Sequence, residues 1–233
     1  MKMKRISIKI IVQAALLVLP CISDAIVVTD NFTQSAAQNS WTASGGACLT
    51  AGNDSPYATG ISVIPSCAAG GVGGATGTLP DASGSGALRL TSNQGFQHGS
   101  IVYNANFPTD QGIQATFTTY VYNGSKDGPV HLGADGISFF LLDGSLAAPG
   151  NIGAAGGSLG YSCSNVDFPY DGVAGGYIGL GLDEWGNFST GPDVNTATGG
   201  PTGYAPNSIV LRGGGSVTAS NFKQKGYKYG DSD

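Results

Sequence analysis

Short apolar runs, separated by Gly, Asn, Asp or Pro, recur along residues 26–233. Many of them are rich in β-branched and aromatic residues, which favour the pleated surface of a β-sheet. Runs of this kind between turn residues are typical of an all-β sandwich or barrel. We predict strands at Ala87–Thr91, Ser100–Tyr103, Ile113–Tyr122, Gly136–Leu142, Tyr177–Asp183 and Ser208–Arg212.

Two of these segments differ in their hydrophobic pattern. Apolar and polar residues alternate in Ile113–Tyr122, which indicates an antiparallel strand with one buried face. Gly136–Leu142 is apolar at nearly every position, which indicates a central strand covered on both faces. No segment after residue 25 has the period of an amphipathic helix, so the sequence predicts an all-β fold.

The first 25 residues have the pattern of a signal peptide. Basic residues precede an apolar run from Ile10 to Pro20, and Ser23-Asp24-Ala25 supplies small residues for the cleavage site. The run is about half the length of a membrane-spanning helix, which disfavours stable membrane insertion. Lipidation of Cys21 is the alternative, although the preceding proline fits that cleavage site poorly. We therefore predict export to the periplasm, the cell surface or the extracellular space.

Residues 26–233 show no linker or internal repeat, and we expect them to form one domain. Four of the ten Lys and Arg residues and one of the fifteen acids lie in the leader, so the remaining chain has a net charge of −8. An acidic chain without a basic stripe is a poor ligand for nucleic acid. Glu184 is the single glutamate, and this scarcity of Glu and Lys disfavours a helical domain.

Three cysteines follow the leader. Eighteen residues, many of them Gly, Pro or Ser, separate Cys48 from Cys67. A disulfide across this segment would stabilise the fold by about 3 kcal/mol by restricting the unfolded chain. We predict this disulfide, which also agrees with export. Cys163 is then either a buried thiol or the partner of a cysteine outside this chain.

Candidate metal ligands lie at the end of a predicted strand. Asp183 and Asn187 are four residues apart, with Trp185 between them, and Asp193 follows in a Gly/Pro turn. Oxygen ligands at this spacing suit a hard cation such as calcium. Zinc would need sulfur or imidazole ligands, and neither His98 nor His131 has a second His or Cys at ligand spacing. Asp and Asn also form turns, so the spacing alone leaves both interpretations open.

Two more features accompany this segment. Asp135 lies at the start of the most apolar strand, where an unpaired carboxylate would be costly; the alternative is a solvated cap at the strand edge. Residues 156–160, with the sequence Gly-Gly-Ser-Leu-Gly, have a nearly bare backbone that would let a ligand approach an amide closely.

These motifs, in this order, resemble those of the L-type (legume-like) lectins. Residues 134–141 resemble the family's "ADG…FFL" strand, residues 156–160 its "GG-x-LG" loop, and residues 182–187 its metal-binding loop. The similarity runs through most of residues 26–233. It implies an all-β, concanavalin-like antiparallel β-sandwich, or jelly roll.

The resemblance also implies a role for each site residue. In the family, the residue at Asp135 follows a cis peptide bond and accepts hydrogen bonds from sugar hydroxyls, while the amide at Gly157 donates to the sugar. Trp185 would stack on the sugar and lend its carbonyl to calcium, and Asn187 would contact both. Asp183 and Asp193 would supply the calcium carboxylates. The expected protein is a calcium-supported lectin that binds a glycan and is not an enzyme.

Two departures from the family pattern change the expected cofactors. The Glu that binds manganese in legume lectins falls at Gly181, and the His of the following strand falls near Asn207 or Ser208. We therefore expect calcium and no transition metal.

A narrower resemblance extends to bacterial lectin-like modules, including those of type IV pilus tip-adhesin-like proteins. It is carried by residues 160–165, 179–184, 195–199, 206–207 and 211–213. This resemblance implies membership of a larger surface or pilus assembly. Related domains continue for several strands beyond the one that matches Ser208–Arg212, so we expect this domain to be truncated at its C-terminus.

Two other functions compete with the lectin prediction. A sandwich-fold glycoside hydrolase needs two carboxylates about 5–10 Å apart. Asp135 and Asp183 are the available pair, because Glu184 points to the opposite face of the strand. The other alternative is a structural module of a surface adhesin that binds no sugar.

Overall fold

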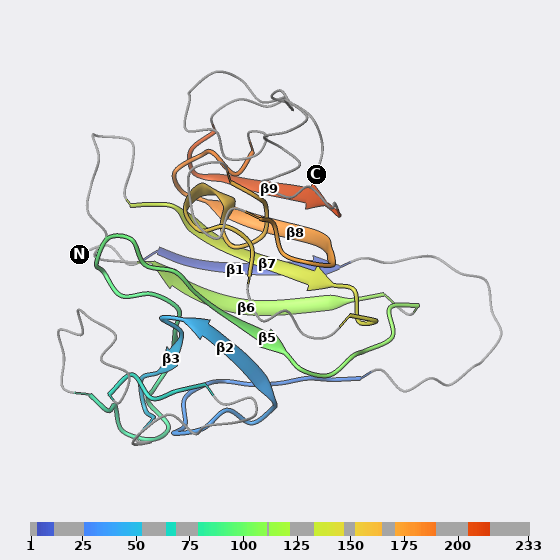
Figure 1. The fold of residues 1–233 in the computed structure, drawn as a ribbon. Coiled ribbons are helices and arrows are strands. Elements are labelled where there is room, and N and C mark those ends of the chain that lie inside the picture. The colour runs from blue at the N-terminus through green and yellow to red at the C-terminus, as the bar shows by residue number, and fades with distance from the viewer. Residues whose placement is uncertain are drawn as a thin grey trace.

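The computed structural model describes residues 26–52, 64–68, 79–110, 112–121, 133–146, 152–164, 171–189 and 205–214, and the backbone of residues 4–11. In these ranges the chain consists of β-strands and a single 3-10 turn (Figure 1). The elements are β1 (Lys4–Ile11), β2 (Trp41–Gly45), β3 (Cys48–Leu49), β4 (Leu88–Arg89), β5 (Gly99–Tyr103), β6 (Gln114–Val121), β7 (Gly136–Leu142), η1 (Gly156–Ser158), β8 (Gly176–Asp183) and β9 (Ser208–Gly213). The predicted all-β class is confirmed.

All strand pairs are antiparallel. They form three two-stranded sheets, β1-β6, β2-β5 and β3-β4, and one three-stranded sheet in the order β7-β8-β9. The six predicted strands are all present, with no end shifted by more than two residues. The strands β2 and β3 were not predicted, because their sequences, WTASG and CL, are too short or too polar to show alternation.

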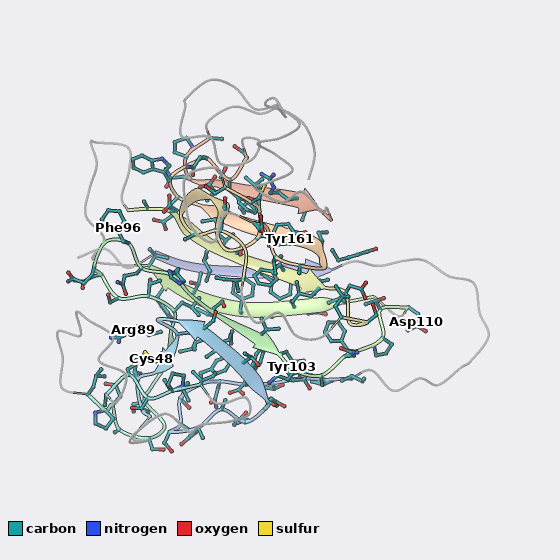
Figure 2. All side chains as sticks on the ribbon, in the orientation of Figure 1. Cys48, Arg89, Phe96, Tyr103, Asp110 and Tyr161 are labelled. Atoms are coloured by element: carbon teal, nitrogen blue, oxygen red, sulfur yellow. A yellow bond between two sulfur atoms is a disulfide. The ribbon has the colours of Figure 1, made fainter. Side chains whose placement is uncertain are left out.

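Glycines on one face of β8 make room for two aromatic rings. A Cβ at Gly179 would lie 2.6 Å from the ring of Tyr161, and one at Gly181 would overlap the ring of Phe188. These rings belong to a buried cluster of Tyr161, Val173 and Phe188, on which Phe140, Leu142, Leu159 and Val210 pack. The Tyr161 hydroxyl donates to the carbonyl of Gly213 at 2.8 Å, which ties the cluster to β9 (Figure 2).

The opposite face of the β7-β8-β9 sheet meets β6. Phe139 of β7 stacks on Phe117 of β6, with ring centroids 5.9 Å apart and an angle of 26° between the planes. Along β6 the residues Ala115, Phe117 and Thr119 are half-buried and their neighbours are exposed. The predicted alternation of this strand is therefore confirmed.

The prediction that Gly136–Leu142 is a central strand is wrong for the described part of the chain. There β7 pairs with β8 alone and ends the sheet, while β8 is central. The apolar pattern of β7 still reflects cover on both faces, since Phe139 packs on β6 and Phe140 lies 5.9 Å from the Tyr161 ring. Both faces of β7 are thus packed, although among the described strands only β8 pairs with it.

The predicted disulfide between Cys48 and Cys67 is present. It joins β3 to a short segment that also pairs with β3 through a parallel bridge between Leu49 and Ser66. Cys48 and Leu49 are completely buried, so this small unit has an apolar centre as well as a covalent link. Cys163 is a buried thiol and is not part of this disulfide.

A carboxylate organises the segment before β2. Asp30 accepts hydrogen bonds from the backbone N–H groups of Phe32, Gln38 and Asn39, and from the indole N–H of Trp41 at 3.0 Å. The Trp41 ring also packs on two other aromatic rings, with centroids 5.6 Å from that of Phe32 and 5.3 Å from that of Tyr103. The start of the domain is thereby fixed to the β2-β5 sheet.

Part of the predicted leader forms a strand in the intact chain. The β1 backbone pairs with β6 in an uninterrupted register from Lys4 opposite Val121 to Ile11 opposite Gln114. The predicted cleavage site, the boundary between residues 25 and 26, and Cys21 lie outside the described residues. Removal of residues 1–25 remains a prediction. In the part of the chain that is described, no helix is long and apolar enough to cross a membrane.

Candidate functional site

The ends of β7 and β8 bring two predicted motifs together. Gly136 stands opposite Asp183 in the register of these strands. The carbonyl of Asp135 accepts the N–H groups of Glu184 at 2.9 Å and Trp185 at 3.0 Å. The Ala134–Asp135 peptide bond is cis, as the lectin resemblance implies. Asp135 is half-buried and lies directly against the segment that carries Trp185 and Asn187.

Only glycine fits at position 136. Its φ of +147° lies in a region that L-residues rarely adopt, and a Cβ there would overlap the carbonyl oxygen of Leu182. The "ADG" motif therefore has a local structural reason for its glycine, since close approach of the β8 backbone depends on it.

The Gly-Gly loop folds over the same end of the sheet. Residues Gly156–Ser158 form the 3-10 turn η1, and Leu159 ends it in the left-handed conformation. The Ser138 hydroxyl of β7 donates to the carbonyl of Leu159 at 2.6 Å. The buried Ser158 hydroxyl donates to the carbonyl of Cys163 at 2.9 Å. These bonds fix the position of the loop relative to β7.

The third motif meets the loop at Gly157. A Cβ on this buried glycine would overlap the carboxamide of Asn187. Glycine at 157 is therefore what allows the Asn187 side chain to lie against the loop backbone. The described structure places all four predicted sugar-contacting residues around one end of the β7-β8-β9 sheet: Asp135, Gly157, Trp185 and Asn187.

Asp183 shapes the loop that follows it. Its side chain is 1% exposed, and its two oxygens accept the N–H groups of Gly186 at 2.7 Å and Phe188 at 2.8 Å. Burial raises the pKa of Asp183 above its ordinary value, and the backbone hydrogen bonds oppose this change in part. These two hydrogen bonds establish that Asp183 shapes the turn after β8.

Residues from two other segments hold the loop. The Arg212 guanidinium of β9 donates to the carbonyl of Phe188 at 2.8 Å and lies 5.4 Å from the centre of its ring. On the other side, the carbonyls of Glu184 and Gly186 accept the N–H groups of Asn207 and Ala205. Sequence analysis missed Phe188 and Arg212 as supports. The sequence gives only a weak indication of this role, namely an arginine among apolar residues in a predicted strand.

A buried hydroxyl lies across the sheet from Asp183. Ser208 stands opposite Asp183 in the sheet, and its buried hydroxyl oxygen has no hydrogen-bond partner among the described residues. A buried hydroxyl normally has a partner, and a cation or a water bound to it would supply one. Oxygen donors without sulfur or imidazole suit calcium rather than zinc.

The carboxylates of the described residues are too few for a metal site by themselves. No group of three or more His, Cys, Asp or Glu side chains within the described ranges is arranged to hold a metal ion. Asp193, the predicted second carboxylate, lies outside those ranges. Of the predicted calcium ligands, Asp183, Trp185 and Asn187 are described, and Asp183 is the one carboxylate among these three.

The raised pKa of Asp183 predicts a pH dependence of stability in protein kept free of divalent cations. An acid with a raised folded-state pKa stabilises the fold most below its unfolded value, near 3.8, and this contribution is lost as pH rises through the folded-state pKa. Between the unfolded-state and the folded-state pKa of Asp183, the free energy of unfolding should fall as pH rises. We expect this fall to be larger in the wild type than in Asp183→Asn. Urea unfolding in chelator across the interval measures the difference, and parallel curves would contradict it.

No protein-family model, curated protein or solved structure matches this chain.

Proposed function

We propose that the chain is a carbohydrate-binding protein of the L-type lectin class, with a concanavalin-like β-sandwich and a calcium-supported site. The observation that carries this proposal is the convergence of Asp135, Gly157 and the Trp185–Asn187 segment at one end of one sheet. These residues come from three segments separated by more than twenty positions each. Turn formation alone gives no reason for an acidic residue, a bare loop and an aromatic residue to meet there.

The proposed mechanism follows from the shape of a sugar ring. A pyranose has hydroxyls around its rim and a patch of C–H bonds on one face. The Asp135 carboxylate and the Asn187 carboxamide would bind the hydroxyls, and the Gly157 amide would donate to the same rim. The half-buried Trp185 would stack on the apolar patch. The hydrogen bonds to Asp135, Phe188 and Asp183 hold these groups in place before the sugar arrives.

Calcium would be held by Asp183, the Trp185 carbonyl, Asn187 and Asp193. Bound there, it would neutralise the buried carboxylate and fix the loop. No transition metal is proposed, because Gly181, at the position of the manganese-binding glutamate, lies under the Phe188 ring and offers no ligand.

Asp183 supports binding better than hydrolysis. A glycosidase would need it beside Asp135 with a carboxylate oxygen facing substrate. Its side chain is instead almost completely buried and accepts two loop N–H groups. The protein is therefore proposed as a lectin and not as an enzyme. Its disulfide agrees with export, and a surface or pilus assembly remains the proposed setting.

A glycan array probed with the purified full chain tests the proposal. We expect binding that falls about tenfold or more in chelator, and about tenfold in Asn187→Ala through loss of its hydrogen bonds. Asn93→Ala, a change at an exposed loop asparagine, should bind as the wild type does. Absence of binding by a folded protein would favour the structural module. Release of reducing ends from polysaccharides, lost in Asp135→Asn, would favour the hydrolase.

A further inference from the structure

The strand β6 has a single strand neighbour in the described part of the chain. It pairs with β1 and with no other element there. Its inner face packs on β7 through the stacked rings of Phe117 and Phe139, but that contact involves side chains and not the sheet edge. Among the described strands, β1 alone therefore provides backbone hydrogen bonds to β6.

The sequence of β1 suits the face that β6 presents. Isoleucine occupies positions 6, 8 and 10 of β1, with Ser7 and Lys9 between. The half-buried residues of β6 stand opposite these isoleucines in the register: Thr119 opposite Ile6, Phe117 opposite Ile8 and Ala115 opposite Ile10. A shift by one residue would place the charged residues opposite the half-buried face instead. Register and pattern thus agree from Ile6 to Ile10.

This neighbour belongs to the segment predicted to be removed on export. Without β1, an eight-residue strand keeps an amphipathic pattern and loses its described strand partner. A long open strand edge with an apolar face is a ready template for another chain, and natural proteins normally cover such edges. Pairing of this kind would also add a strand to the layer that packs on β7.

We infer that β6 is an acceptor for an extended segment of a second polypeptide, with apolar, preferably β-branched, residues at every second position. In the intact chain residues 4–11 fill this place, and after leader removal the partner's strand takes it. Main-chain hydrogen bonds along β6 would supply affinity, and the alternation would supply specificity. This site is separate from the proposed sugar site and does not depend on it.

The test uses the full chain with a specific protease sequence inserted after Ala25. The cut protein is incubated with an excess of a labelled peptide that has the sequence of residues 4–11. The complex is isolated by gel filtration, and the bound peptide is quantified by mass spectrometry. The uncut chain is the matched control, because its own strand remains tethered. Two further peptides carry N-methyl groups either on the three isoleucines at 6, 8 and 10 or on the residues at 5, 7 and 9.

We expect the cut protein to take up the unmodified peptide and to protect the β6 amides from hydrogen exchange, while the uncut chain takes up little. In an antiparallel pair, alternate residues point their N–H groups to the same neighbour. One methylated peptide should therefore bind normally and the other at least tenfold more weakly, through loss of several hydrogen bonds. Equal binding of both methylated peptides, or no uptake by the cut protein, would overturn the inference.

Discussion

Replacing Asp183 with alanine is expected to lower the free energy of unfolding by about 3 kcal/mol, because two buried N–H groups lose their acceptor. These groups belong to Gly186 and Phe188, and both bond to the Asp183 carboxylate. Each unsatisfied buried donor costs about 1–3 kcal/mol, and removal of a buried charge offsets part of the total. Urea unfolding followed by circular dichroism, in chelator, measures the change.

Asp143→Ala is a matched control for this variant. Asp143 also follows a strand directly, and its carboxylate accepts the N–H of Ser145 at 2.8 Å. It is exposed, however, so water can replace the lost acceptor. We expect a far smaller change in stability. Equal destabilisation in the two variants would mean that burial of Asp183 contributes nothing to its role in the loop.

Calcium separates the two proposed roles of Asp183. If the cation binds the folded protein, stability should rise by about 2.7 kcal/mol at a hundredfold excess of calcium over its dissociation constant. Asp183→Ala should remove this gain in addition to its effect in chelator. A wild type whose unfolding is insensitive to calcium would contradict the metal site while leaving the turn-forming role intact.

Replacing Gly157 with alanine is expected to weaken glycan binding about a hundredfold and to change the fold little. The added Cβ would overlap the Asn187 carboxamide, which is the end of a side chain and can rotate away. Asn187 then leaves the position from which it would contact the sugar, and the amide at 157 becomes less accessible. The glycan identified on the array, titrated calorimetrically, measures the loss.

Gly213→Ala provides the comparison for Gly157→Ala. A Cβ at Gly213 has no atom within 4 Å, so the same chemical change is made without a contact. Glycan affinity should stay at the wild-type value. Unchanged affinity in both variants would mean that the contact between residues 157 and 187 has no part in binding.

The strands were predictable where the sequence repeats a pattern over several residues. Alternation in β6 and the apolar run in β7 each predicted a strand within a residue of its observed ends. The short strands β2 and β3 escaped prediction because they are held by pairing with β5 and β4 and by the disulfide, not by a pattern of their own. The position of β7 at the end of its described sheet was not predicted either. Its apolar pattern reflects packing on both faces, and part of that packing comes from Tyr161, which lies in a loop.

The site residues were predictable as motifs, but their supports were not. Asp135, Gly157 and Asn187 stand in motifs that a single sequence displays in order. Phe188 and Arg212 are twenty-four residues apart and meet only because β8 pairs with β9. The glycines at 179 and 181 fall in a predicted strand, but the sequence does not show that two aromatic rings pack over them. Contacts of this kind depend on which strands pair, and the sequence of a single strand does not show its partner.

The environment of Trp41 has a consequence for spectroscopy. The chain contains two tryptophans, and Trp41 is fixed by its bond to Asp30 and by the rings of Phe32 and Tyr103. Its strand, β2, lies on the other side of β6 from β8 and β9 (Figure 1). Its emission should therefore stay constant when a ligand reaches the loop after β8. With selective excitation of tryptophan, a ligand-induced change in emission would come from Trp185, which makes the unlabelled protein its own optical sensor for that loop.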